Sequence, residues 1–178
     1  LGKMLGMSKA GIFKYYKNKQ ELFIAVVDKF WFSTQNPRNK FTETNGTFAE
    51  FIDEYVRGVQ RTMDMLGDLI GADRNKVAQG KFTYHAQYFH FLFQLLQYDP
   101  DAKEKLRNLV EVDYAYWRAA IQRAIATGEL REDVDVEEAV VMFRQVYMGL
   151  SFEMSFLGGL NTEKLSKHLH AVYSLLKR

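Results

Sequence analysis

Histidines and carboxylates are the side chains of this chain that could bind a metal or transfer a proton. His85 and His90 are five residues apart, which places them about 140° apart around a helix, and His168 and His170 also diverge. The chain has no cysteine, so the usual zinc-ligand spacings are absent. Residues 133–135 begin like a calcium loop, but no glycine follows where such a loop needs one. We therefore expect no metal, no cofactor and no catalytic site, and no enzymatic activity.

Lysine side chains gather near the start of the sequence, where they could bind the phosphates of a nucleic acid. Residues 1–40 hold seven lysines and one arginine against two acidic residues, a net charge of +6, while the whole chain carries +2. Positive charge concentrated at one end is what nucleic-acid binding requires. A solvated basic end on an ordinary helical protein gives the same pattern, so charge alone leaves both interpretations open.

The elements that would carry these lysines are predicted from turn and cap residues. Residues 1–5 are typical of the last turn of a helix, and Gly6 can adopt the positive φ that stops one. Ser8 is a suitable N-cap for a short helix over residues 9–16. Helix, turn and short helix is the outline of a helix-turn-helix, whose second helix enters the major groove of DNA.

A third helix follows this outline. Asn18 is its N-cap, and Glu21 lies three residues on, where it can complete a capping box. Helical spacing then predicts an inward apolar stripe formed by Leu22, Phe23, Val26, Val27 and Phe30.

The segment LGMSKAGIFKYYKNKQELF, residues 5–23, resembles the helix-turn-helix of the tetracycline-repressor (TetR) family of bacterial transcription regulators. Residues 125–135 are similar, more weakly, to a segment that precedes the last two helices in that family. The resemblance implies an all-α fold, with an N-terminal DNA-binding domain and a larger helical domain for ligand binding and dimerisation. The matching positions in the first segment are Leu5, Gly6, Met7, Ser8, Ile12, Phe13, Tyr15, Tyr16, Lys19 and Leu22.

The resemblance also implies which side chains contact DNA. Lysine can donate to O6 and N7 of guanine, and hydroxyl and ammonium groups are ordinary donors to phosphate. Phe13 stands where tyrosine is usual, which removes one hydroxyl. The positions that face base edges are Lys9, Ala10, Gly11 and Lys14, and those that contact phosphates are Ser8, Tyr15 and Lys19.

By the same resemblance, the first helix of the DNA-binding domain and part of the second would precede Leu1. A single turn such as residues 1–5 is far shorter than the roughly 12 residues that an isolated helix needs. We therefore expect the natural chain to be longer than this sequence.

The composition favours a helical, well-packed protein. The 178 residues are 47% hydrophobic and 15% aromatic and include only two prolines, which suits one or two helical units sharing a core. No apolar run approaches the roughly 20 residues that cross a bilayer, and no signal peptide opens the sequence. The lack of cysteine fits a reducing compartment. We expect an all-α, cytoplasmic protein with no membrane partner.

The polar, turn-rich residues 35–46 divide the chain. We expect a partial helix-turn-helix domain over 1–34, a linker over 35–46, and a ligand-binding and dimerisation domain over 47–178. In this last part, helices are predicted over residues 47–66, 81–98, 99–127, 135–157 and 161–176, with a short helix within 67–80. The caps and stops behind these predictions are Thr47 with Glu50, Asp99 with Pro100, Gly128, Asp135, Gly158 with Gly159, and Asn161.

Two of these helices carry more apolar surface than a single contact can bury. Residues 81–98 are apolar on nearly all sides, so we expect this helix to be central. Residues 135–157 have two apolar faces, and the second face, together with the last helix, suits a four-helix bundle formed with a second copy of the chain. The alternative is that both faces are internal.

Aromatic residues between positions 48 and 156 permit an apolar cavity, although such stripes also form plain cores. The cavity follows from the resemblance, and the ligand would be a small, largely apolar effector. The candidate ligand-binding residues are Tyr55, Met63, Tyr84, Tyr88, Tyr114, Trp117 and Tyr147.

We therefore interpret the chain as a homodimeric, ligand-responsive, DNA-binding transcriptional regulator, a repressor that its effector releases from the operator. One alternative is a helical small-molecule enzyme or carrier with a basic N-terminal end, which would need paired titratable groups in its cavity. A second alternative is a helical adaptor for another protein.

Overall fold

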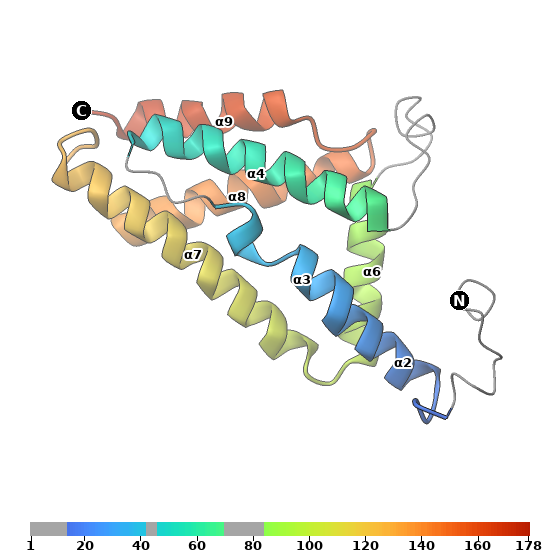
Figure 1. The fold of residues 1–178 in the computed structure, drawn as a ribbon. Coiled ribbons are helices and arrows are strands. Elements are labelled where there is room, and N and C mark those ends of the chain that lie inside the picture. The colour runs from blue at the N-terminus through green and yellow to red at the C-terminus, as the bar shows by residue number, and fades with distance from the viewer. Residues whose placement is uncertain (1–13, 42–45, 70–83) are drawn as a thin grey trace.

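The computed structural model describes residues 14–41, 46–69 and 84–178, and does not describe the side chains of residues 69 and 84–87. Over the described residues, the named elements are all helices (Figure 1), which confirms the predicted all-α fold. The helix-turn-helix predicted over residues 1–16 lies almost entirely outside this part.

Two groups of helices make up the fold (Figure 1). Helices α4, α7, α8 and α9 pack against one another as a bundle, and α6 closes one end by packing against α8, α7 and α4. The first helices of the chain lie against α6. In chain order the elements are α2 (Lys19–Val26), the π-helix η1 (Val27–Trp31), α3 (Phe32–Thr34), the 3-10 helix η2 (Pro37–Asn39), α4 (Phe48–Leu69), α6 (Tyr84–Tyr98), α7 (Ala102–Ala126), α8 (Val136–Ser155) and α9 (Thr162–Leu176).

Local cap chemistry determines where most of these helices begin and end, as predicted. The Asn18 side chain accepts the N–H of Glu21 at 2.8 Å, and Thr47 and Glu50 exchange hydrogen bonds as a capping box. Gly128, at φ 75°, follows the end of α7. The Asp135 and Asn161 side chains cap α8 and α9.

The start of α7 differs slightly from the prediction. Asp99 accepts the N–H of Asp101 at 3.0 Å, as a cap would, but the regular helix begins at Ala102. A difference of two residues is usual for helix ends. The short helix expected within residues 67–80 falls mostly outside the described part, and α4 continues through residue 69.

The π-helix η1 makes the predicted stripe on the first helix partly wrong. The N–H of Phe32 bonds to the carbonyl of Val27, five residues back, which adds one residue to the turn. Val27 and Trp31 consequently face inward and are buried. Val26 and Phe30, which we expected on the inner face, are rotated outward, and Phe30 is 41% exposed.

The prediction that the helix over residues 81–98 is central is also wrong. Helix α6 buries Phe89 and Leu95, but Phe93 is 61% exposed, and Leu96 and Tyr98 are exposed as well. The helix lies at the end of the bundle, so its neighbours cover only part of its surface. Sequence periodicity cannot tell a helix surrounded by partners from one whose outer side is simply apolar.

The core of the bundle is aromatic and centres on Trp117 of α7, which is fully buried. Its indole stacks on Phe143 of α8 with ring centroids 4.8 Å apart and meets Phe51 and Tyr55 of α4 edge-on. Aromatic pairs in these geometries add to the free energy of burial. One side chain therefore joins α4, α7 and α8.

Residues 35–41, expected as part of a linker, include the short 3-10 helix η2 and are packed into the body. Gln35, Pro37, Lys40 and Phe41 are buried. The Phe41 ring stacks on Tyr116, with centroids 4.7 Å apart. We call residues 35–41 the connector, because they join the first helices to α4.

Glu129, in the turn between α7 and α8, holds the far end of the bundle together. Its carboxylate accepts the N–H of Phe48 at 2.8 Å, at the start of α4, and the hydroxyl of Tyr173 on α9 at 2.7 Å. Burial and this carboxylate raise the pKa of Tyr173 to about 12, so the hydroxyl stays protonated and able to donate.

Replacing this carboxylate should destabilise the bundle more than removing an exposed one. Glu129→Ala deletes two short hydrogen bonds to a charged group, so we expect the free energy of unfolding to fall by about 2–4 kcal/mol. Glu132→Ala, at an exposed position three residues on, should change it by no more than about 0.5 kcal/mol. Urea denaturation measures both values, and equal losses would contradict this role for Glu129.

Candidate functional site

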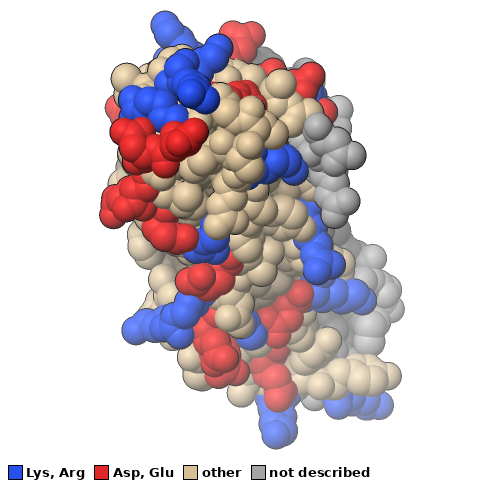
Figure 2. All heavy atoms as spheres, turned by 90° about the vertical axis from the view of Figure 1, so that its left-hand side faces the viewer, with Lys and Arg blue, Asp and Glu red and all other residues tan. Residues whose placement is uncertain are grey.

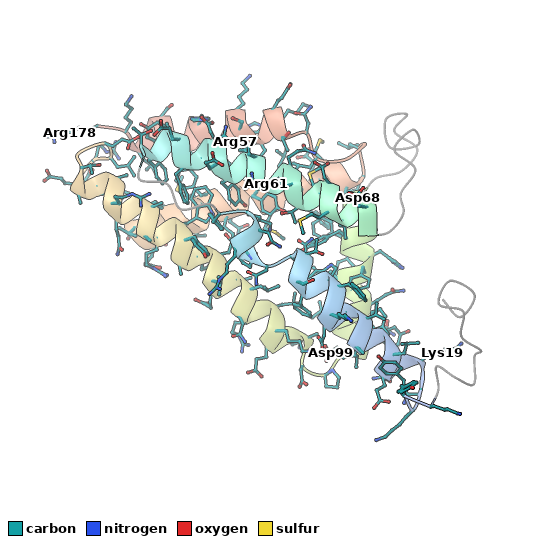
Figure 3. All side chains as sticks on the ribbon, viewed as in Figure 1. Lys19, Arg57, Arg61, Asp68, Asp99 and Arg178 are labelled. Atoms are coloured by element: carbon teal, nitrogen blue, oxygen red, sulfur yellow. The ribbon has the colours of Figure 1, made fainter. Side chains whose placement is uncertain are left out.

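The basic end lies at the start of α2, away from the bundle. Lys19 is the first residue of α2 and lies at the opposite end of the molecule from Arg178 (Figure 3). Lys14 and Tyr15 form an exposed turn just before it, and Tyr15 is 75% exposed. These three side chains are free to contact a large partner. The other predicted DNA contacts, Ser8, Lys9, Ala10 and Gly11, lie outside the described residues.

Charge is distributed differently over the bundle. On the face shown in Figure 2, basic and acidic side chains are interspersed. Mixed charge of this kind provides no continuous surface for a row of phosphates. The basic excess therefore belongs to the segment around α2.

Helix α2 and the following π-helix η1 are fixed to the body by polar contacts near the C-terminal end of α6. The Gln20 side chain donates to the carbonyl of Tyr98 at 2.7 Å. Lys105 bridges Asp28 at 2.7 Å and Asp99 at 2.9 Å. Burial lowers the pKa of Lys105, but the two carboxylates outweigh it and raise the pKa overall.

A second, smaller core fixes the same helix by aromatic packing. Trp31 stacks on Tyr88 of α6 with ring centroids 5.7 Å apart, and Phe23 contacts Phe91 at 5.5 Å. Trp31 reaches Tyr88 because η1 turns it inward. The first helices therefore pack directly on Tyr88 and Phe91 of α6.

A cavity lies on the other side of Tyr88, between the connector and helices α4, α6 and α8. The space open to the centres of water molecules is about 30 Å³, enough for roughly two waters. In this form, a larger ligand could enter only if the wall moved. The lining residues are Gln35, Val59, Thr62, Met63, Leu66, Tyr88, Phe89, Tyr147, Met148 and Ser151.

Three of the predicted ligand-binding residues, Met63, Tyr88 and Tyr147, line this cavity. Tyr55 and Trp117 are fully buried in the aromatic core and do not line it. The remaining two are Tyr114, which is partly buried and lies under Arg144, and Tyr84, whose side chain is not described.

Lys40 and Asp113 are buried beside this cavity and Arg144 is half-buried there, and none of the three was among the predicted site residues. Arg144 Nε lies 3.8 Å from Asp113 Oδ2, longer than a hydrogen bond. Lys40 Nζ lies 4.9 Å from the centre of the Tyr147 ring. Burial raises the pKa of Asp113, while Lys40 and Arg144 oppose that shift.

A signal for this cluster was present in the sequence. Asp113 interrupts the apolar stripe of α7, and Arg144 follows Phe143 on the inner side of α8. A charged residue on the apolar side of each of two helices suggests a buried pair. Lys40 gave no such signal, because it lies in a polar segment that looked solvated.

The described residues contain no cluster of three or more metal-ligating side chains. None of the described helices is both long enough and apolar enough to cross a membrane.

The helices that form this cavity match a known protein family. The model of the tetracycline repressor-like C-terminal domain matches residues 49–152. The chain belongs to the TetR family. It is therefore a transcriptional regulator, and the matched region includes every cavity-lining residue except Gln35.

The fold of the whole chain agrees with this assignment. A crystal structure described as a TetR-family transcriptional regulator from Rhodococcus sp. superimposes with a TM-score of 0.63 at 14% sequence identity. The alignment covers 98% of this chain and 84% of that one. At this identity the similarity concerns the fold alone. Curated proteins gave no significant match.

The connector of this TetR-family chain is held against α4 by a glycine. A Cβ added at Gly58 would overlap the backbone carbonyl of Lys40. Glycine therefore permits an approach that places Lys40 over Tyr147. Every other residue type at position 58 would push the connector away from the cavity.

Gly58→Ala tests how tightly the connector packs against α4. Alanine is better than glycine in a helix by about 1 kcal/mol, so a loss of stability can come only from the clash. We expect a net loss of about 1–3 kcal/mol, as for overpacked cores, together with a changed near-ultraviolet circular dichroism signal from Trp31 and Trp117. A variant as stable as the wild type would mean that the connector is loosely held.

Proposed function

We propose that this TetR-family regulator is a cytoplasmic repressor that binds operator DNA as a homodimer and is released by a small effector. The observation that carries the proposal is Tyr88, which contacts Trp31 on one side and lines the cavity on the other. A ligand in the cavity and a DNA at the basic end would therefore act on the same helix.

The DNA-binding part of the proposal rests on the basic end and on the sequence resemblance. Lys14, Tyr15 and Lys19 are exposed donors of the kind that contact phosphates. From the resemblance, Ser8, Lys9, Ala10 and Gly11 complete the DNA contacts. In a dimer, two such ends would enter successive major grooves about 34–36 Å apart.

The dimer is proposed through α8 and α9. Apolar side chains recur along the outer face of α8, and Leu175 of α9 is exposed too. Exposed apolar side chains gathered on one face often mark a protein–protein interface. A second copy could cover it as the other half of a four-helix bundle. The exposed apolar residues at α8 and just after it are Val141, Met142, Phe152, Phe156 and Leu157.

The effector is proposed to act by binding preferentially to a second conformation of the same protein. The cavity has room for roughly two waters, so a ligand would bind better to a form in which Tyr88 or Tyr147 has moved outward. Moving Tyr88 would shift Trp31 and with it α2. The ligand would then weaken DNA binding by its differential affinity for the two forms.

The alternative, an enzyme or carrier, has less support. General acid–base catalysis needs titratable groups facing the substrate. The described residues that line the cavity include tyrosines but neither a histidine nor a carboxylate. This lining suits binding better than proton transfer.

Binding to the DNA upstream of its own gene tests the regulator. For the whole protein, including any residues that precede Leu1, six to ten phosphate contacts would lower affinity about a thousandfold or more between about 50 and 200 mM salt. Binding should also survive excess competitor DNA. Fluorescence anisotropy measures both. Salt-independent binding, or complete displacement by competitor, would contradict the proposal.

Lys19→Ala sharpens the same test. Loss of one phosphate contact per protomer should reduce the slope of log affinity against log salt by roughly 2 for the dimer. Arg123→Ala is the matched control, because Arg123 is an exposed cation in the last turn of α7. Its slope should equal that of the wild type.

Phe156→Glu should convert the dimer to a monomer. Phe156 is 72% exposed just beyond α8, and two-fold symmetry would bring two added carboxylates into one apolar interface. Phe93→Glu, at a phenylalanine on α6 that is 61% exposed, should leave the dimer intact. Light scattering after size-exclusion chromatography gives both masses. A monomeric wild type, or a monomer produced by the α6 variant, would argue against the α8–α9 interface.

A further inference from the structure

Polar atoms without hydrogen-bond partners occur on Ser151, which lines the cavity, and in the core behind Tyr147. Within the described part of the chain, the Tyr55 hydroxyl, the Ser151 hydroxyl and Asp113 Oδ1 are buried and make no hydrogen bond, and the same holds for Arg144 Nε. Buried polar groups are normally paired, and leaving them unpaired costs free energy. Several such atoms together suggest a place where something polar is meant to bind.

The charges of this cluster do not balance. Lys40 is only 6% exposed, and the Arg144 side chain is only 15% exposed. Asp113 is the single carboxylate that interacts with both. Charges taken out of water are normally matched one for one. The described side chains therefore leave an excess of one positive charge beside the cavity.

Burial of Asp113 strengthens this asymmetry. Burial raises the pKa of this carboxyl, so ionising it costs more free energy than ionising an exposed carboxyl. Lys40 has no hydrogen-bonding anion of its own among the described residues, and its ammonium group lies over the Tyr147 ring.

The cations and the cavity are continuous along α8. Arg144, Tyr147 and Ser151 are three and four residues apart, so they lie on one side of the helix. Tyr147 and Ser151 line the cavity, and Arg144 extends the same side toward Asp113. A ligand whose body filled the aromatic part could therefore direct one end toward Arg144 and Lys40.

We propose that the effector is a small aromatic or apolar acid whose single carboxylate is bound by Lys40 and Arg144, with the Tyr55 hydroxyl as a further donor. Its body would lie against Met63, Tyr88 and Tyr147. Charge-assisted bonds from lysine and arginine are the strongest that a carboxylate can receive. This inference rests on the proposed function and adds to it the chemical class of the ligand.

Because of the position of Lys40, binding of a carboxylate would also affect the connector. Lys40 belongs to the connector, and its backbone packs against Gly58. A carboxylate that draws Lys40 toward the cavity would move the segment that joins the DNA-binding end to the body. A neutral ligand of the same shape would fill the cavity without attracting the Lys40 ammonium group.

Matched acid and amide pairs test the ligand class. The probes are benzoate, phenylacetate, 1-naphthoate and indole-3-acetate, each against its primary amide, titrated calorimetrically into the whole protein. Acids should bind at least about tenfold more tightly than their amides. Lys40→Met keeps the side-chain stem and removes the charge, so it should abolish the difference. Amides that bind as well as the acids, or no binding by any acid, would overturn the inference.

A measurement without ligand keeps the test independent of the probes. If Lys40 is held for a ligand, removing its unbalanced charge should raise the urea midpoint of the ligand-free protein. A purely structural lysine would give a lower midpoint, which would also overturn the inference. Lys103→Met, at an exposed position on α7, is the control and should leave the midpoint unchanged.

The DNA assay separates this inference from the proposed function. If amides bind and release DNA as well as acids do, the proposed regulator function is supported and the preference for acids is contradicted. If acids bind selectively but leave DNA affinity unchanged, the proposed ligand class is supported and the proposed release of DNA by the effector is contradicted.

Discussion

The rest of the structure depends on one contact, the packing of the connector against the aromatic side chains of the bundle. Phe41 stacks on Tyr116 and meets Trp117 edge-on, and Gly58 allows the preceding carbonyl to touch α4. A connecting segment that packs in this way is part of the core and cannot swing freely. The first helices and the bundle therefore form one mechanical unit.

This unit combines a stable core with a less stable site. Around Trp117, aromatic rings of α4 and α8 pack in close contact. Beside it, Asp113 and Arg144 are separated by more than a hydrogen bond and leave polar atoms unpaired. Proteins commonly give up stability at functional sites in this way. The aromatic core supplies the stability that lets such a cluster remain buried.

The sequence predicted what local chemistry determines and missed what distant contacts determine. Asn18, Thr47 and Asp135 cap helices because each side chain needs only its own backbone as a partner. The inward turn of Trp31 depends on a π-helix whose inner face is covered by Tyr88, nearly sixty positions later in the chain. The burial of Lys40 likewise depends on α4 and α8. Neither contact leaves a periodic trace in the sequence.

The candidate site was therefore only partly predictable from the sequence. Its most informative residues are the charged ones that interrupt an apolar stripe. Met63, Tyr88 and Tyr147 fit an apolar stripe, and such a stripe predicts a cavity and a core equally well. Asp113 and Arg144 fit no stripe, and burying them requires a reason that packing does not supply. Tyr88 and Tyr147 link the two kinds of residue, since each lines the cavity and also contacts the segment leading to the basic end. Under the proposed function, a ligand that displaced either ring would also shift that segment.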